Sequence, residues 1–375
     1  MKKLLLIILL LIIILNINNN VKQEETRGIF ISYIELSEYI KDLNEKESKI
    51  NIRKMIKNIK DYSLNTIVLQ VRVSSDAIYN SKIFPDSEYV TSSKMSYDVL
   101  DYFIKESHKN NIKLYAWINP YRVKTTSDIN LIKEDNPAYK YIGTDTLYIN
   151  KGIYYNPAKK EVTDLIVAGV KEVLEYDIDG LLFDDYFYPD DSVDRNDYEE
   201  YLKNHKRISL QEYHFNNVNN MVKKVYKECK AKNIKFGISP DGNITNNYEK
   251  NYADVKEWLN SEEYLDFIIP QIYYGFNNEA KSYTTALNEW QSINKNKDML
   301  IALALYKVGQ EDMFARGGNR EWIDNNNILM REVILARNIN NYKGFILFRY
   351  DNLFNKNNYT NNSLEEIKNL KKVIK

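Results

Sequence analysis

The sequence predicts an α/β protein whose fold is a single (β/α)8 TIM barrel. Eight β-rich runs alternate with eight helical patterns along the chain of 375 residues, and no second composition regime interrupts them. Such repeats join parallel strands by right-handed crossovers, and barrels of this length are common as one unit. The alternative is an open doubly wound sheet. Against it, Gly28 stands alone, and no glycine-rich phosphate loop follows the first run.

The predicted strands are mostly continuous apolar runs, of which Gly-Leu-Leu-Phe at residues 180–183 is typical. Such runs indicate parallel strands that are covered on both faces. The eight predicted strands are residues 28–33, 66–73, 113–119, 180–185, 235–239, 267–273, 300–306 and 344–350.

The predicted helices carry apolar residues at three- and four-residue spacing, as in Ile52, Met55, Ile56 and Ile59. This spacing gives a helix one apolar face, which can pack against a sheet. The eight predicted helices are residues 51–62, 97–110, 159–176, 210–232, 251–260, 284–293, 329–340 and 363–373.

Long segments follow predicted strands three, four and seven, at residues 120–157, 186–209 and 307–328. In a (β/α)8 barrel, the loops that follow the strands form the active face. We therefore expect these three segments to surround a cleft that is long enough for an extended polymer.

The first twenty residues are predicted to be a signal peptide or an N-terminal anchor, followed by the barrel at residues 27–375. Lys2 and Lys3 precede an unbroken apolar run at residues 4–15. This run is shorter than the roughly 20 residues that span a bilayer, and no small-x-small cleavage pattern follows it. We expect an exported protein, extracellular or on the cell surface, that contacts a membrane only through a retained N-terminal segment.

Composition and motifs argue against several classes of protein. Lys plus Arg and Asp plus Glu both total 52, so the net charge of zero suggests no nucleic-acid partner. The three histidines, His108, His205 and His214, form no His-Glu-x-x-His pattern, and we predict no metal and no cofactor. Cys229 is the single cysteine and can form no intramolecular disulfide, and the sequence contains no Gly-x-Ser-x-Gly elbow.

Two consecutive acids, Asp184 and Asp185, end the apolar run at residues 180–183. Acids in this position are costly unless they are paired, solvated in a cleft or functional. Strand alternation sends the two side chains in opposite directions. We predict that Asp184 points into the barrel mouth and is catalytic, with Asp185 orienting its neighbours. The alternative is that both acids brace loops.

Amides, arginines and aromatic residues follow the other predicted strands. Tyrosine occurs 31 times, and it combines a ring face with a hydroxyl, which suits the binding of sugars, although codon bias is an alternative cause. The arginines could instead neutralise the acids, and single aromatic residues could serve packing. The predicted substrate-binding residues are Arg72, Trp117, Asn119, Tyr121, Arg122, Tyr186, Tyr188, Gln271, Tyr273, Tyr274 and Arg349.

This collection of side chains is typical of a sugar site, and cleavage of a glycosidic bond needs two carboxyl groups. One protonates the leaving oxygen, and the other acts as nucleophile or base. Asp76, Asp241 and Asp351 follow strands two, five and eight and are available near other strand ends. We predict Asp184 as the leading catalytic carboxylate, with Asp185, Asp76 and Asp241 as its candidate partners. Each could also be a structural acid.

Several stretches together carry a family resemblance: residues 27–30, 70–72 with 76–79, 116–122, 179–189, 238–240 and 270–273. With them, the sequence resembles the glycosyl hydrolase-like 10 family (DUF187), bacterial exported (β/α)8 barrels, over roughly residues 26–350. The resemblance implies hydrolysis of bacterial glycan strands, and some relatives cleave peptidoglycan chains that lack stem peptides. Many relatives have an aromatic residue where this chain has Asp241, which marks a subgroup variant.

We therefore predict an exported glycoside hydrolase that cleaves bacterial cell-wall, peptidoglycan-type or related polysaccharide by carboxylate acid/base catalysis. Its partner would be a polysaccharide or glycan strand. The first alternative is a non-catalytic carbohydrate-binding protein of the cell surface that keeps the barrel. The second is a metal-assisted hydrolase or lyase, and the scarcity of histidine argues against it.

Overall fold

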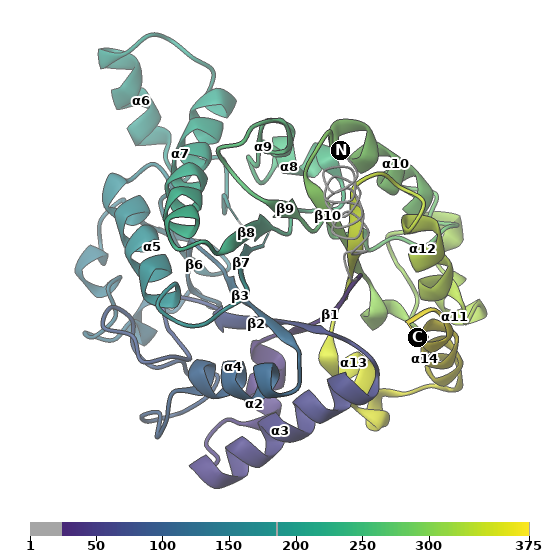
Figure 1. The fold of residues 1–375 in the computed structure, drawn as a ribbon. Helices are drawn as coiled ribbons and strands as arrows, with labels where there is room; N and C mark the ends of the chain where they lie inside the picture. Colours follow the sequence, from purple (N-terminus) through teal and green to yellow (C-terminus); the bar gives the residue numbers. More distant parts are fainter. Residues whose placement is uncertain (1–24, 185–186, 375) are drawn as a thin grey trace, which may run out of the picture.

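The computed structural model describes residues 25–184 and 187–374, and in this part of the chain eight parallel strands close into a barrel (Figure 1). Strand β1 pairs with both β2 and β11, so the first and last strands complete the ring. The predicted (β/α)8 barrel is confirmed. The barrel strands are β1 (Thr26–Ile31), β2 (Thr66–Arg72), β3 (Lys113–Ile118), β7 (Gly180–Phe183), β8 (Lys235–Ile238), β9 (Phe267–Ile268), β10 (Asp298–Leu303) and β11 (Tyr342–Leu347).

Helices surround the barrel on its outside (Figure 1). Each predicted helical pattern overlaps one of them, and their apolar faces pack with outward-facing strand residues in the main core. These helices are α3 (Glu45–Asp61), α4 (Val99–Lys109), α5 (Lys160–Val173), α7 (Leu210–Ala231), α9 (Val255–Asn260), α10 (Tyr283–Ile293), α12 (Ile328–Ala336) and α14 (Asn361–Ile374).

Several short elements that the sequence did not predict lie in the segments after the barrel strands. Most of them are too short to show a clear period, and the ten residues of α6 include none that is buried. The segment at residues 73–98 after β2 is also long and has neither a helix nor an extended strand, although the sequence indicated long segments only after strands three, four and seven. The short elements are α2 (Tyr33–Tyr39), α6 (Arg195–Asn204), α8 (Ile244–Glu249), α11 (Glu321–Asp324), α13 (Tyr350–Phe354) and the antiparallel strands β4 (Arg122–Lys124), β5 (Leu147–Ile149) and β6 (Ile153–Tyr155).

Strand β9 ends well before the predicted limit at residue 273. Pro270 follows it and has no N–H to donate to a neighbouring strand. Isolated bridges from Gln271 to Asp241 and to Ala302 continue the pairing beyond the proline. The backbone of Gln271 is therefore still held between β8 and β10.

The inside of the barrel has an apolar floor and a polar mouth. Its floor is a buried cluster that includes Val68, Trp117 and Leu182, because alternate strand residues point inward. Two residues further along each strand, towards its carboxyl end, the inward position is polar in six of the eight strands. We call these polar residues the polar layer; they are Ser32, Gln70, Asn119, Asp184, Ser239 and Gln271.

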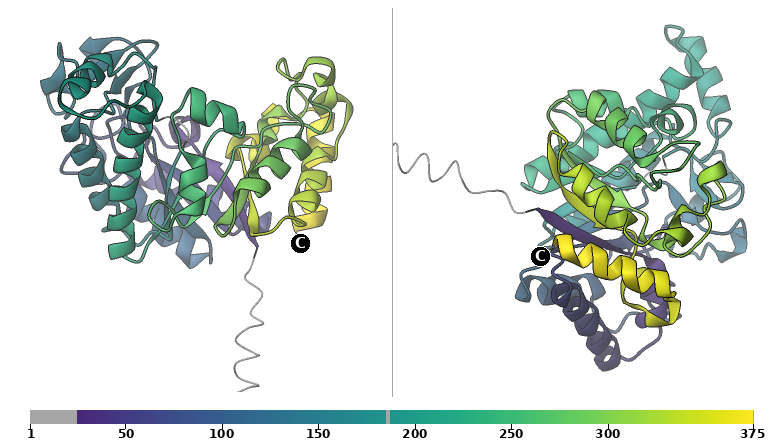
Figure 2. Two further views of the ribbon diagram at one scale, coloured as in Figure 1. Left: turned by 90° about the horizontal axis from the view of Figure 1, so that it is seen from above. Right: turned by 90° about the vertical axis from the view of Figure 1, so that its right-hand side faces the viewer.

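The amino end of β1 lies at the end of the barrel remote from this mouth and next to the C-terminal helix (Figure 2). Arg337 connects the two, since it donates to the Glu25 carboxylate and, at 2.7 Å, to the Val373 carbonyl. Within the described residues, no helix has the length and apolar character needed to cross a bilayer. The predicted signal or anchor, residues 1–20, lies outside the described residues.

Two buried acids lie between α12 and α14. Burial raises the pKa of Glu366 to about 7, against the effect of hydrogen bonds from the Ile328 and Leu329 N–H groups at 3.0 and 2.7 Å. Burial, and then repulsion by Glu366, raise the pKa of Glu332 well above its ordinary value. Neither carboxyl oxygen of Glu332 has a hydrogen-bond partner within the described chain.

We expect these acids to make the protein less stable at pH 8 than at pH 5. Below pH 4.5, the folded and unfolded chains both hold the Glu366 proton, but between 4.5 and about 7 only the unfolded chain releases it. Stability is therefore lost as the pH rises through this range, by about 3 kcal/mol for Glu366. Urea unfolding measures the stability that Glu366→Gln gains over wild type, and this gain should be larger at pH 8 than at pH 5. The exposed neighbour variant Glu365→Gln is the control, and an unchanged pH dependence in Glu366→Gln would contradict the prediction.

Candidate active site

A cavity of about 240 Å³ opens at the polar mouth of the barrel. Its wall is formed by the carboxyl ends of the barrel strands and by the segments that follow them. Six of the predicted site residues line it: Trp117, Asn119, Arg122, Asp184, Gln271 and Tyr273. We call this space the mouth cavity.

Asp184 points into the mouth cavity, in the direction that alternation from the inward-facing Leu182 predicts. Only 4% of Asp184 is exposed, and its Oδ2 accepts a hydrogen bond from the Asn119 Nδ2. Among the described residues, it is the one carboxylate that lines the mouth cavity. Asp185 and Tyr186, which the sequence also indicated, lie outside the described residues.

Aromatic rings cover the floor of the mouth cavity. Phe30 contacts Trp117 edge to face, with 5.4 Å between ring centroids, and it contacts Phe348 at 5.5 Å. The centroid of the Tyr273 ring lies 5.8 Å from that of the Phe348 ring. Flat ring faces beside carboxyl and amide groups can pack against sugar rings while their hydroxyls are hydrogen-bonded.

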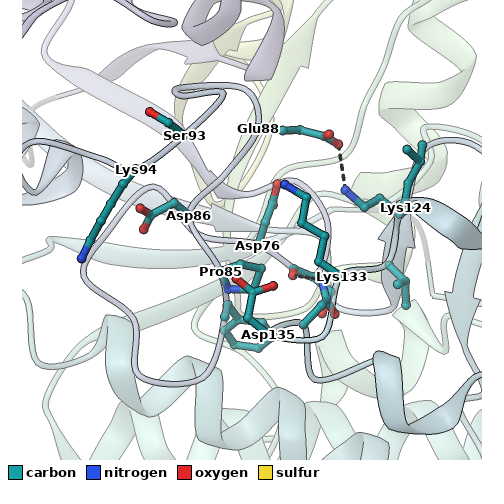
Figure 3. Close-up of a pocket in the computed structure, with 14 residues that line it drawn as sticks. Asp76, Pro85, Asp86, Glu88, Ser93, Lys94, Lys124, Lys133 and Asp135 are labelled. Carbon is teal, nitrogen blue, oxygen red and sulfur yellow. Dashed lines mark hydrogen bonds and ion pairs between the residues drawn. The ribbon is translucent and has the colours of Figure 1, made fainter.

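Asp76 lines a different cavity, of about 370 Å³, between the segments that follow β2 and β3 (Figure 3). Its carboxylate accepts hydrogen bonds from the Ser87 hydroxyl at 2.9 Å and the Ser74 N–H at 3.3 Å. Burial raises the pKa of Asp76. Lys124 and Glu88 form an ion pair of 3.1 Å across the same wall. The structure therefore does not bring Asp76 to the mouth cavity, and its bonds brace the segment after β2.

Asp241 follows β8, the strand next to β7 in the barrel, but it is not in the wall of the mouth cavity. Its two carboxyl oxygens accept hydrogen bonds from the Asn243 N–H at 2.7 Å and the Asn246 Nδ2 at 2.9 Å. These bonds shape the turn that leads into α8. Asp351 lies in α13, where it accepts a 2.5 Å hydrogen bond from the Tyr39 hydroxyl.

Arg72 was predicted to bind substrate, but it packs behind the barrel wall. The pairing of β2 with β3 shifts register between Gln70 and Arg72, and such a bulge changes the direction of the side chain. The guanidinium carbon lies 3.8 Å from the centroid of the Phe84 ring, and the residue is 2% exposed. Strand alternation alone would have placed Arg72 on the same side as Gln70.

Two predicted tyrosines are buried away from the mouth cavity. Tyr121 is 1% exposed, and burial raises the pKa of its hydroxyl. Tyr188 donates a 2.8 Å hydrogen bond to Asp194, and its ring lies 4.4 Å from that of His214. Both residues serve packing in the described structure.

Two further predicted residues lie near the mouth cavity without lining it. Arg349 forms a 2.6 Å ion pair with the buried Glu35, which joins the end of β11 to the first turn of α2. Tyr274 is half-buried, and burial, with the nearby charge of Asp241, raises the pKa of its hydroxyl.

Several residues that line the mouth cavity were not among the predicted site residues. Gln70 and Ser239 belong to the polar layer, and Tyr33 begins α2. The period of two would have indicated Gln70, because it follows the inward-facing Val68 by two residues. No such signal marks Tyr33. Within residues 25–184 and 187–374, no group of three His, Cys, Asp or Glu side chains is arranged to hold a metal ion.

A closed parallel barrel whose mouth holds a carboxylate, amides and aromatic rings has the architecture of a TIM-barrel glycoside hydrolase, and the family of the chain assigns it to that class. The chain belongs to the glycosyl hydrolase-like 10 family, whose family model matches residues 25–320. It is 33% identical over 346 residues to glycosyl hydrolase YngK of Bacillus subtilis (strain 168), which covers 84% of this chain and 66% of that protein. It is 31% identical over 324 residues to glycosyl hydrolase DigH of Escherichia coli (strain K12), covering 77% of this chain and 73% of the relative.

Solved structures of low sequence identity share the fold. The glycoside hydrolase domain of PgaB (BpsB) from Bordetella bronchiseptica has a TM-score of 0.59 at 14% identity, covering 92% of this chain and 98% of that domain. The endo-1,4-β-mannanase of Rhizomucor miehei has a TM-score of 0.54 at 12% identity, covering 95% and 96%. Both similarities concern the barrel architecture.

Removing the charge of Arg122 or of Arg72 should distinguish a residue that binds substrate in the mouth cavity from one that packs behind the barrel wall. Arg122 lines the mouth cavity, so Arg122→Met should lower kcat/KM about ten-fold or more, the loss expected for one charged hydrogen bond. Any change in its melting temperature should be smaller than that of the control variant. Arg72→Met is the matched control, and it should shift the melting temperature while KM stays near the wild-type value. Release of reducing ends from a glycan measures the kinetic effect, and thermal unfolding measures the effect on stability. A loss of activity in Arg72→Met with a larger loss of stability in Arg122→Met would contradict the prediction.

Proposed function

We propose that the protein is an exported hydrolase of bacterial cell-wall glycan, of the peptidoglycan type, with Asp184 as its leading catalytic carboxylate. The observation that carries this proposal is the position of Asp184. It is a buried carboxylate at the polar mouth of the barrel, held by Asn119 and surrounded by aromatic rings. In (β/α)8 enzymes, the catalytic groups lie at this end of the strands.

Hydrolysis of a glycosidic bond requires a second carboxyl group beside Asp184. Asp185 is its neighbour in the chain, and Asp241 follows the adjacent strand β8, with a side chain that is partly exposed. These two are the candidate partners. Asp76 is excluded as the partner, because it lines the other cavity and not the mouth cavity.

The other residues of the mouth cavity would bind and orient the sugar. Trp117 and Tyr273 offer ring faces, and Arg122 and Gln271 offer N–H donors to hydroxyl or carboxylate oxygens. Long segments after β3, β7 and β10 supply the rim of the barrel mouth, which suits a polymer better than a small sugar. The choice of peptidoglycan-type glycan is supported by the family resemblance.

The direction of β1 determines where a retained N-terminal segment would join the barrel. Chain that precedes Thr26 joins the amino end of β1, at the end of the barrel opposite to the mouth cavity. A retained N-terminal segment would therefore join the barrel at the end remote from the mouth cavity.

Asp184→Asn should fold normally and hydrolyse glycan at least about 100-fold more slowly, because the amide can neither take up a proton nor carry the negative charge. The measurement is release of reducing ends from purified peptide-free wall glycan, with the products identified by mass spectrometry. Asp76→Asn is the matched control and should keep most of the activity. Full activity in Asp184→Asn would remove the assignment. Tight glycan binding without products from the wild-type protein would instead favour the non-catalytic binding protein.

Deletion of residues 1–20 should retain the protein inside the producing bacterial cell, because these residues carry the proposed export signal. Fractionation and immunoblotting of the full-length and shortened chains measure this. The full-length protein should be found outside the cell or at its surface. Equal distribution of the two chains would contradict the proposed export.

A further inference from the structure

A chain of three hydrogen bonds, the first partly buried and the other two buried, ends at Asp184. The backbone N–H of Tyr33 donates to the Gln70 Oε1 at 3.0 Å, and the Gln70 Nε2 donates to the Asn119 Oδ1 at 2.5 Å. The Asn119 Nδ2 then donates to the Asp184 Oδ2. Gln70 and Asn119 are each 1% exposed, so water has little access to the two amide side chains. We call these three bonds the amide relay.

The direction of the amide relay is fixed at its first bond. A backbone N–H can only donate, so the Gln70 atom that faces Tyr33 must be the carbonyl oxygen. The Nε2 of Gln70 is then a donor, which requires Asn119 to present its own carbonyl oxygen. As a result, Asn119 must present N–H to Asp184. The Tyr33 N–H thus sets the orientation of the Gln70 amide, and the Gln70 amide sets that of Asn119.

The Tyr33 N–H is itself held in place. Tyr33 is the first residue of α2, where a backbone N–H has no partner within the helix. The Ser32 and Glu35 side chains form a capping box at this end, and Glu35 is paired with Arg349 at 2.6 Å. These contacts keep the start of α2, and with it the donor, beside Gln70.

We propose that Gln70 is a positioning residue that acts through Asn119 to keep Asp184 ionised and oriented in the mouth cavity. This proposal rests on the proposed function of Asp184 as a catalytic carboxylate. An N–H donor favours the charged form of a carboxylate, whereas a facing carbonyl oxygen favours the protonated form. The amide relay thus suits Asp184 to act as nucleophile or base and leaves protonation of the leaving oxygen to another group.

Other groups also face Asp184 across the mouth cavity. Among the described residues of its wall, Arg122 carries a positive charge, and Tyr33 and Tyr273 are titratable. Ser239 and Gln271, from the segments after β8 and β9, are neutral. A test of the amide relay must therefore change the relay while it keeps Arg122 and Tyr273 in place.

Two variants interrupt the amide relay at different points. Gln70→Glu keeps the shape of the side chain but replaces its donor by an oxygen, so Asn119 is favoured to turn and present its carbonyl oxygen to Asp184. Tyr33→Pro removes the N–H that fixes the first amide, and proline is well tolerated as the first residue of a helix. The extended backbone of Ser32 (φ −97°, ψ 176°) is also compatible with a following proline. Tyr33→Ala is the matched control, because it removes the same ring and keeps the N–H.

The titration of Asp184 can be followed by carboxyl ¹³C NMR of protein labelled at aspartate, with the signal assigned by its absence in Asp184→Asn. We expect the midpoint to rise by about one pH unit or more in Gln70→Glu, where an added charge contributes as well, and to rise less in Tyr33→Pro. Tyr33→Ala also removes the ring that faces Asp184, so its midpoint measures the effect of the ring alone and should rise less than in Tyr33→Pro. The acid limb of kcat/KM should follow the same order, with a larger effect on kcat than on KM in Gln70→Glu.

An unchanged midpoint in both Gln70→Glu and Tyr33→Pro would overturn the proposal, as would equal shifts in Tyr33→Pro and Tyr33→Ala. A change in KM alone would assign Gln70 to substrate contact instead. The NMR readout does not depend on activity. If the midpoints shift as expected but Asp184→Asn keeps its full hydrolytic rate, the amide relay stands as a control of the charge on Asp184, and the proposed function of Asp184 fails.

Discussion

Closure of the barrel between β1 and β11 is the constraint on which the rest of the structure depends. Residues 26–29 pair with residues 344–347, so nearly the whole length of the chain is joined at this one ladder. Once the ring is closed, inward-facing residues at the same height on different strands lie around one axis. The polar layer at the mouth consists of such residues. Its members are far apart in sequence and meet only because the ring is complete.

Burying polar groups above an apolar floor is costly unless they are hydrogen-bonded. The mouth of this barrel meets the requirement with bonds that run between strands, from Tyr33 through Gln70 and Asn119 to Asp184. The Glu35–Arg349 ion pair adds a connection from the end of β11 to α2. The bonds that satisfy buried groups are thus the same bonds that orient the candidate catalytic carboxylate.

The family motifs contain both cavity residues and structural residues. In the stretch from Gln70 to Asp76, Gln70 lines the mouth cavity, Arg72 packs on Phe84, and Asp76 ties down the segment after β2. A charged residue in such a stretch therefore does not indicate a role in binding by itself. Its role depends on which side of the barrel wall it faces.

The sequence by itself determined the eight strands, the eight helices and the parallel barrel, because continuous apolar runs and helical periods report local burial. Alternation also indicated that only one of Asp184 and Asp185 faces the barrel mouth, but the choice of Asp184 follows from the pairing that turns Leu182 inward. Only the tertiary structure decided which polar residues meet. A register shift turns Arg72 out of the mouth, Pro270 ends β9 early, and the start of α2 brings the Tyr33 N–H to Gln70. These outcomes depend on the pairing of one strand with another and on the packing of distant segments, which no pattern within a single segment records.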